Sequence, residues 1–201
     1  LGQLEEAVKS FEKALSIDSS NQLFWVGFSN VLRVIRFKSF DDSMVPYFLQ
    51  ALQQSSIRPN DISGAIISML RHHPNLLIAL EACKTGAIKG EINHLANQLT
   101  SIPLLLQLME LCPIPDTEIE RLLRLIRQAT LNQLTDETIE PANLPFYVAL
   151  ALHCFTNEYV FLESSEETPE IEQLENKINS LLANNKPVPS LWIALLASYR
   201  P

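Results

Sequence analysis

The chain has 201 residues, 47% of them hydrophobic, and a formal net charge of −8 at pH 7. A chain of this length and composition can bury a substantial core, in one large domain or two smaller ones. The acidic balance argues against a nucleic-acid partner, because such proteins usually present a basic face. Only five glycines occur, which disfavours β-rich folds and phosphate-binding loops, since both use glycine heavily.

Cysteine usage and hydropathy bear on the compartment in which the protein works. The three cysteines, Cys83, Cys112 and Cys154, lie far apart in the sequence and are odd in number. This pattern predicts reduced thiols and a cytoplasmic protein. No apolar run reaches the roughly 18 residues that a membrane span needs, so we expect no membrane partner.

The first twenty residues carry a specific pattern of small and aromatic side chains. Gly2, Ala7, Phe11 and Ala14 have the spacing of the second half of a tetratricopeptide repeat (TPR), a helical hairpin of about 34 residues. Ala7 and Ala14 share a helical face on which only a small side chain lets a partner helix approach. The resemblance implies a repeat without its first helix, and we expect the chain to be a piece of a longer protein. An ordinary amphipathic helix is the alternative.

A second helix, expected from Asn21 to about Arg36, extends this resemblance. Trp25 falls where the first helix of a TPR carries its large aromatic residue. Asn30 falls where peptide-binding TPRs can place an Asn, although the Lys expected four positions earlier is Val26. The candidate groove residues are Trp25, Asn30 and Arg33. We expect residues 1–38 to be the remnant of a TPR array, about one and a half repeats long.

Residues 39–201 are expected to form a second, helical domain. Periodicity and cap residues predict helices at about 39–52, 62–70, 76–83, 91–99, 103–111, 116–134, 144–155, 168–184 and 190–199. No segment shows the sustained alternation of a strand. The predicted fold class is therefore all-α, with TPR-like helical hairpins followed by a bundle of short helices.

Motifs for catalysis, phosphate binding or metal binding are absent from the sequence. His72 and His73 are adjacent, and His153 is adjacent to Cys154. Neighbouring residues on a helix point about 100° apart, because a helix has 3.6 residues per turn, so neither pair easily shares one metal ion. We expect no metal site.

A row of arginines offers two interpretations. Arg121, Arg124 and Arg127 recur every three residues on one predicted helix. The simpler interpretation is a solvated face supported by pairs such as Glu120 with Arg124; the other is a stripe that binds acidic groups. The stretch from Gln128 to Asn176 has ten Asp or Glu and no Lys or Arg, and is a candidate to dock against this stripe.

The helix at 144–155 is apolar almost all round, which predicts neighbours on several sides. Polar Asn157, Glu158 and Tyr159 follow it. The simpler interpretation is a helix C-cap, with the Asn157 side chain satisfying carbonyls of the last turn. The alternative is a buried acid/base carboxylate, with Glu158 and His153 facing a shared pocket.

Residues 153–161, His-Cys-Phe-Thr-Asn-Glu-Tyr-Val-Phe, resemble the C-F-x-N-E-Y-V-F segment of TPR-containing, S-adenosylmethionine-dependent methyltransferases. Residues 113–123 resemble that family's P-x-P-D-x-x-x-E-x-L-L region, and residues 196–201 its A-x-Y-x-P-L end before the catalytic part. The resemblance covers nearly all of the chain. It marks Phe155, Asn157, Glu158, Tyr159 and Phe161 as motif residues, structural or at an interface, and assigns them no catalytic role.

The family's pattern also implies what this chain lacks. A methyltransferase holds S-adenosylmethionine on a glycine-rich loop after a strand, and the chain contains no such loop. We therefore expect no cofactor in this segment, and expect S-adenosylmethionine in a separate catalytic domain.

The predicted function is a non-catalytic region that packs on its own C-terminal catalytic domain and recruits a protein partner or substrate. One alternative is a stand-alone TPR scaffold, and another is an enzyme that uses Glu158 with His153. Tyr159 and Phe161 are expected to anchor the bundle, so Phe161→Ala would cost about 3–5 kcal/mol if Phe161 were fully buried.

Overall fold

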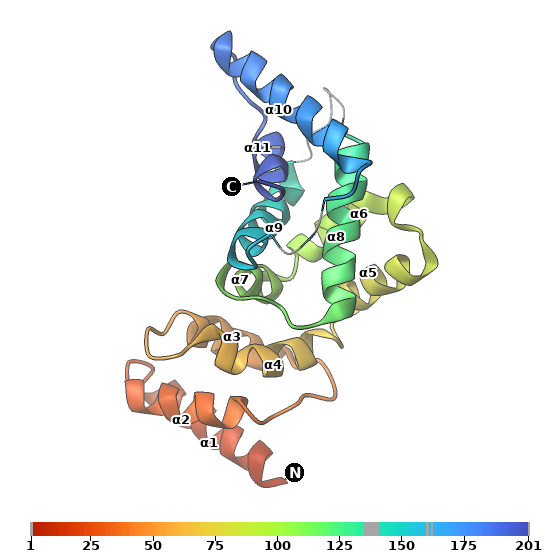
Figure 1. Ribbon diagram of the computed structural model, residues 1–201. Helices are drawn as coiled ribbons and strands as arrows, with labels where there is room; N and C mark the ends of the chain where they lie inside the picture. Colours follow the sequence, from red (N-terminus) through yellow and green to blue (C-terminus); the bar gives the residue numbers. More distant parts are fainter. Residues whose placement is uncertain (1, 135–140, 160, 162, 201) are drawn as a thin grey trace. The chain divides into compact units, whose positions relative to one another are not determined.

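The computed structural model describes residues 2–134, 141–159, 161 and 163–200, and these residues form an all-α protein (Figure 1). They contain eleven α-helices and two short 3₁₀ helices, and no strand. The chain divides into two compact units, Leu1–Pro74 (unit 1) and Asn75–Pro201 (unit 2). The all-α prediction is confirmed. The domain boundary expected at residue 38 falls inside unit 1.

Unit 1 begins with a helical hairpin of α1 (Gly2–Ile17) and α2 (Gln22–Leu32). The 3₁₀ helix η1 (Asp42–Met44) leads into α3 (Val45–Leu52), and α4 (Pro59–Leu70) packs against α2. The Asn21 side chain caps α2 by accepting a hydrogen bond from the Leu23 N–H at 3.0 Å, as Asn does at a helix N-terminus. Pro59 occupies the first position of α4, where its missing N–H has no helical acceptor to lose.

Aromatic side chains hold unit 1 together. Trp25 and Phe28 on α2 are fully buried, and their ring centroids lie 6.1 Å apart. The Phe28 ring also contacts Phe11 on α1 and Tyr47 on α3, each at 6.2 Å. A Cβ added at Gly27 would lie 2.6 Å from the Phe11 ring, so glycine at this position permits the close approach of α1 and α2.

The second helix ends earlier than the sequence predicts. We expected it to continue to Arg36, but α2 ends at Leu32. The chain then leaves helical geometry and is held to α4, because the Ser68 hydroxyl accepts a hydrogen bond from the Phe37 N–H at 2.9 Å. The Phe37 ring packs against Phe48 with the centroids 5.8 Å apart. This tertiary packing overrides the local helical pattern.

Unit 2 is a bundle of seven α-helices among its described residues. Its helices are α5 (Pro74–Thr85), α6 (Ile88–Thr100), α7 (Pro103–Leu111), α8 (Thr117–Asn132), α9 (Leu144–Thr156), α10 (Glu167–Ala183) and α11 (Ser190–Ala197), with the 3₁₀ helix η2 (Pro141–Asn143) before α9. Asp116 caps α8 by accepting hydrogen bonds from the Glu118 and Ile119 N–H groups, both at 3.1 Å.

Helix α9 packs against α7, α11 and α6, and Figure 1 shows it between α7 and α11. It contributes Phe146, Tyr147, Leu150 and Cys154 to the core. A further core cluster joins α8, α10 and α11: Leu131, Ile171, Leu174, Ile178, Trp192, Leu195 and Tyr199. No helix in the described part of the chain combines the length and hydropathy that crossing a bilayer requires.

Candidate functional site

The C-terminus of α9 closes through the backbone of the predicted motif residues. The Tyr159 N–H donates to the Cys154 carbonyl at 2.8 Å, and the Glu158 N–H donates to the Phe155 carbonyl at 3.1 Å. These two bonds are the Schellman pattern, which satisfies carbonyls that the last helical turn leaves open. The C-cap interpretation is confirmed for the backbone. The Asn157 side chain does not take part, since its Nδ2 has no hydrogen-bond partner among the described residues.

The residue at the left-handed position of this cap is unusual. Glu158 has φ of +52° and Tyr159 has φ of +55°. The same pattern ends α10, where the left-handed residue is Asn185, and the longer of the two bonds also closes α5, where the left-handed residue is Gly86. Glycine and asparagine are the usual residues there, because a larger side chain in the left-handed region costs about 1–2 kcal/mol. Glu158 therefore occupies a position that backbone energetics would give to glycine.

His153 and Glu158 lie in opposite environments. The His153 side chain is fully buried, whereas Glu158 is exposed. Burial lowers the pKa of His153, while the nearby Met109 backbone raises it by a smaller amount. Neither ring nitrogen has a hydrogen bond of good geometry within the described part of the chain. The structure therefore gives no support to the hypothesis that these two residues face a shared pocket, because His153 lies in the core and Glu158, which follows the end of α9, is exposed.

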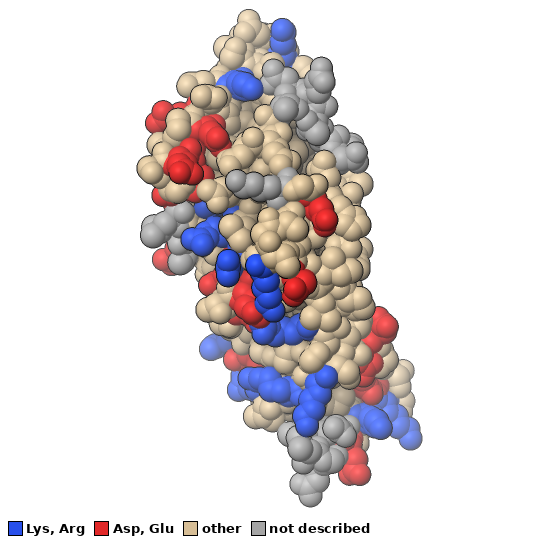
Figure 2. All heavy atoms as spheres, turned by 90° about the vertical axis from the view of Figure 1, so that its right-hand side faces the viewer, with Lys and Arg blue, Asp and Glu red and all other residues tan. Residues whose placement is uncertain are grey.

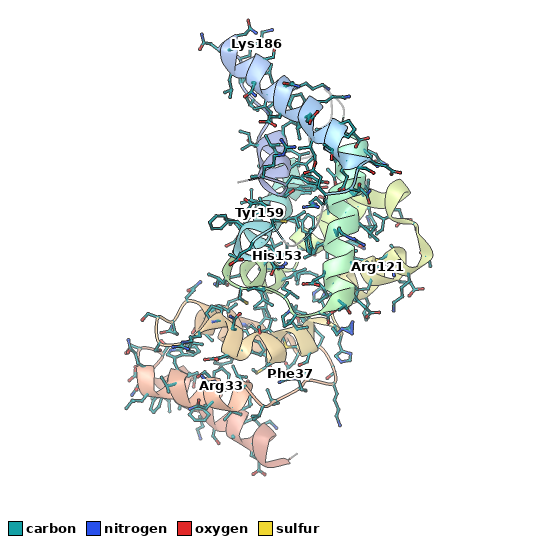
Figure 3. All side chains as sticks on the ribbon, in the orientation of Figure 1. Arg33, Phe37, Arg121, His153, Tyr159 and Lys186 are labelled. Carbon is teal, nitrogen blue, oxygen red and sulfur yellow. The ribbon has the colours of Figure 1, made fainter. Side chains whose placement is uncertain are left out.

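Arg127 is the residue whose role the sequence did not reveal. Arg121 and Arg124 are exposed, but Arg127 is 1% exposed, so the three arginines do not form one stripe. Arg127 follows Leu123 by four residues and Ile126 by one, and that spacing on the buried side of α8 was the available signal. Figure 3 labels Arg121 on the side of unit 2 opposite Tyr159 in that view.

The guanidinium group of Arg127 joins three segments of unit 2. Its Nη1 donates to the Ser198 carbonyl at 2.9 Å, and its Nη2 donates to the Phe161 carbonyl at 3.2 Å. The guanidinium carbon lies 3.9 Å from the centroid of the Tyr199 ring, within the range of a cation–π interaction. Burial raises the pKa of the Cys154 thiol, and Arg127 beside it opposes that rise.

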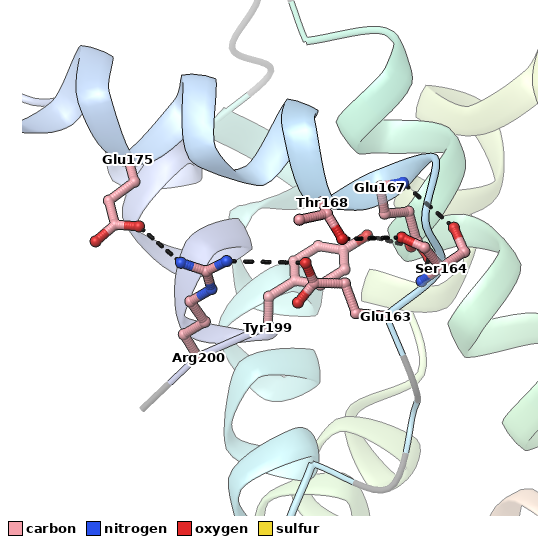
Figure 4. A network of polar contacts seen from close by, with 7 residues as sticks. All are labelled: Glu163, Ser164, Glu167, Thr168, Glu175, Tyr199 and Arg200. Carbon is pink, nitrogen blue, oxygen red and sulfur yellow. Dashed lines mark hydrogen bonds and ion pairs between the residues drawn. The ribbon is translucent and has the colours of Figure 1, made fainter.

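A buried carboxylate continues this network (Figure 4). The Tyr199 hydroxyl donates to Glu167 Oε1 at 2.8 Å, and Glu167 Oε2 accepts from the Ser164 N–H at 2.9 Å. The Ser164 hydroxyl in turn accepts from the Glu167 N–H at 3.3 Å, which completes a capping box before α10. Burial, followed by the bond to Glu167, raises the pKa of Tyr199 far above its ordinary value, against the effect of Arg127.

This network, Arg127 with Glu167 and Tyr199, is structural rather than catalytic. Its members are buried, so a substrate has no access to the polar atoms. It ties the segment after α9 and the end of α11 to α8. Arg200 adds a surface link, with Nη1 2.9 Å from Glu175 Oε2 and Nη2 3.8 Å from Glu163 Oε1. The acidic stretch thus approaches the buried arginine through Tyr199.

Phe161 is not fully buried, which was the condition for a large cost of truncating it. Its ring is only partly buried, although it packs 6.0 Å from His153 and 5.6 Å from the Arg127 guanidinium carbon. Because full burial was the condition for a cost of about 3–5 kcal/mol, the expected cost of truncating Phe161 is smaller. Tyr159 is also only partly buried.

The three candidate groove residues of unit 1 do not share a surface. Trp25 is fully buried, and its Nε1 donates to the Ser19 carbonyl at 2.8 Å. Asn30 is exposed, and Arg33 forms an ion pair with Asp61 on α4. A groove role for Trp25 is therefore wrong: it lies on the side of α2 that carries Phe28 and Leu32, which faces the core.

Unit 1 has a cavity of about 350 Å³ between α1 and the segment that follows α2. Its polar residues include Glu12 and Asp41 but also Lys9 and Lys38. Burial raises the pKa of Glu12, nearby Asp41 raises it further, and Lys9 opposes them. Two carboxylates balanced by two ammonium groups select no ligand charge, so this cavity identifies no ligand class.

The surface of α9 offers the clearest site for a partner. Val148, Leu152 and Phe155 are spaced by four and three residues, so they form one stripe on the helix, which we call the α9 face. They are 41%, 41% and 64% exposed. The prediction that α9 is covered on several sides therefore holds for its other faces only. A row of large exposed apolar side chains is typical of a protein interaction surface.

The charged surface elsewhere is mixed. Figure 2 shows Lys and Arg side chains interspersed with Asp and Glu on the face that it draws. The described residues contain no group of three or more His, Cys, Asp or Glu side chains placed to hold a metal ion. All three cysteines are free and buried. Among the features described above, we take the α9 face as the candidate functional site.

Comparison of the chain with known protein families, with curated proteins and with solved structures finds no match.

Proposed function

We propose that this chain is the non-catalytic helical region of a methyltransferase-like protein, and that it recruits a protein partner or substrate. The observation that carries the proposal is the α9 face. Phe155, its most exposed member, belongs to the segment that resembles the methyltransferase family. A rigid helix that presents apolar side chains is suited to binding another protein, because apolar burial drives most protein association.

The resemblance supplies the rest of the proposal. S-adenosylmethionine would bind a catalytic domain separate from these residues, against which the helical region packs. The free, buried cysteines suit the cytoplasm. The net charge of −8 favours a protein over nucleic acid as the partner.

Protein retention by variants tests the role of the α9 face. The variant Leu152→Gln/Phe155→Gln removes apolar surface while keeping a good helix former at both positions. Leu182→Gln is the matched control, because Leu182 is 58% exposed on α10. Proteins retained by the immobilised chain and identified by mass spectrometry should persist with Leu182→Gln and disappear with the double variant. Equal retention by both variants would contradict the proposal.

The gene itself tests the link to a methyltransferase. Residues encoded after Pro201 should include a strand followed by a glycine-rich turn, the element that holds S-adenosylmethionine. A separately produced domain of this kind should bind the chain in a calorimeter. If no such element is encoded, the stand-alone scaffold becomes the better interpretation, with the α9 face still its binding surface.

A further inference from the structure

Exposed apolar side chains also occur on two helices that pack against α9. Leu111 at the end of α7 is 42% exposed, and Ile193 on α11 is 53% exposed. Both helices pack against α9, and Met109 on α7 lies close enough to His153 to affect its pKa. The end of α7 therefore lies beside the end of α9 that carries Phe155.

The helices that carry these exposed apolar side chains, α7, α9 and α11, contain no Lys or Arg. Glu110 is exposed on α7 next to Leu111, and Glu158 is exposed three residues after Phe155. Both acids lie at the same end of the face, because the end of α7 approaches the end of α9. An apolar surface with an acidic border complements a partner whose apolar surface has a basic border.

Glu158 has a backbone conformation that is unfavourable for a residue with a side chain. Its left-handed φ of +52° would suit glycine, yet the chain has a carboxylate there. The cap is formed by main-chain atoms. Within it, the Glu158 side chain makes no hydrogen bond to another described residue. A strained residue whose side chain does not stabilise the fold points to a role outside the fold.

We propose that the α9 face binds an amphipathic helix of a partner protein, with apolar residues against Leu152 and Phe155 and Lys or Arg against Glu158 and Glu110. This inference rests on the proposed function, and adds the chemistry of the partner. The acidic border disfavours the other occupants of such a face. A second copy would bring like charges together, and an anionic membrane surface would repel both glutamates.

A displayed library of amphipathic helices tests the partner chemistry directly. The library keeps leucines at positions i, i+3, i+4 and i+7 and randomises the residues that flank this stripe. It is selected against the whole chain and depleted against Leu152→Gln/Phe155→Gln. Helices that bind the chain should be enriched in Lys and Arg at the flanking positions. Selection against Glu110→Lys/Glu158→Lys should instead enrich Asp and Glu.

Affinities of one selected helix separate the apolar and the charged contributions. Leu152→Gln/Phe155→Gln should weaken binding by roughly tenfold or more, because central apolar residues dominate interfaces. Glu110→Gln/Glu158→Gln should weaken it by about three- to tenfold at low salt, and by less at high salt. Glu81→Gln/Glu172→Gln removes two exposed acids from α5 and α10, and should leave the affinity unchanged. Circular dichroism verifies that each variant is folded.

The results can overturn the proposed partner chemistry without overturning the proposed protein-binding function. Helices that require Leu152 and Phe155 but have neutral or acidic flanks would overturn the charge preference and leave a protein-binding α9 face intact. If no selected helix depends on these two residues, both proposals fail. A dimer in sedimentation that dissociates in Leu152→Gln/Phe155→Gln would show a second copy on the face, and would overturn the partner proposed here.

Discussion

Different interactions stabilise the cores of the two units. The core of unit 1 is a cluster of aromatic rings from helices that are adjacent in sequence, with Phe28 touching rings on α1, α2 and α3. The centre of unit 2 instead contains Arg127, whose hydrogen-bond partners Phe161 and Ser198 are 34 and 71 residues away. Sequence periodicity can identify the first kind of core, but the second depends on contacts that no local pattern encodes.

The largest effect is expected from removing the charge at the centre of unit 2. Arg127→Ala leaves the Ser198 and Phe161 carbonyls without their donor and empties the space over the Tyr199 ring. We expect the free energy of unfolding of unit 2 to fall by about 2–5 kcal/mol, because each buried acceptor that loses its donor costs about 1–3 kcal/mol. Denaturant unfolding and hydrogen exchange of α10 and α11 measure it.

Arg124→Ala is the matched control for this change. Arg124 lies on the same helix and is exposed, so its removal should alter stability by less than about 0.5 kcal/mol. Equal effects of the two substitutions would show that the network of Arg127, Glu167 and Tyr199 does not hold unit 2 together.

A smaller loss is expected from crowding the core of unit 1. In Gly27→Ala the new Cβ would lie 2.6 Å from the Phe11 ring. The ring must shift, and we expect unit 1 to lose about 1–3 kcal/mol, typical of overpacking. Faster hydrogen exchange in α1 and α2 measures the loss. Combining the substitution with Phe11→Leu should restore part of the stability, and a double variant no better than Gly27→Ala would contradict the steric explanation.

The buried histidine of unit 2 makes stability depend on pH. Because burial lowers the pKa of His153 in the folded protein, the unfolded chain binds the proton more readily. Stability is then complete above the unfolded pKa of about 6.5 and falls as the pH drops below it. Between pH 7.5 and pH 5.5, the free energy of unfolding measured in urea should fall less for His153→Gln than for the parent chain.

Burial also lowers the pKa of His73 in unit 1, so part of the pH dependence should remain in His153→Gln. His73→Gln is therefore the comparison variant. A loss in His153→Gln as large as that of the parent chain would contradict the assignment to His153.

The smallest expected effect is a gain in the stability of unit 2. Glu158→Gly removes a side chain from the left-handed region and should stabilise unit 2 by about 0.5–1 kcal/mol, the strain relieved less the added backbone entropy of glycine. Thermal unfolding measures the gain, and Asn185→Gly at the end of α10 is the comparison, where little change is expected. If Glu158→Gly destabilised the protein, Glu158 would contribute to the fold, and its assignment to a partner would lose its main support.

Much of the local structure was predictable from the sequence. The start of α2 and the extent of α7 and α9 agree with the prediction to within a residue or two, because caps and apolar periodicity act over short stretches of chain. A C-cap after α9 was also predicted, and the backbone hydrogen bonds of Glu158 and Tyr159 form one. The sequence did not reveal that His153 is buried and Glu158 exposed, because a local pattern gives no sign of which distant segments cover a residue.

The sequence by itself determined the all-α fold class and most of the helix ends. Only the tertiary structure decided three further features: that α2 stops at Leu32, that Arg127 is buried while Arg124 is not, and that one apolar face of α9 stays uncovered. The physical reason is the same in each case. Helical hydrogen bonds and caps involve near neighbours, whereas burial depends on which distant segments pack against a helix.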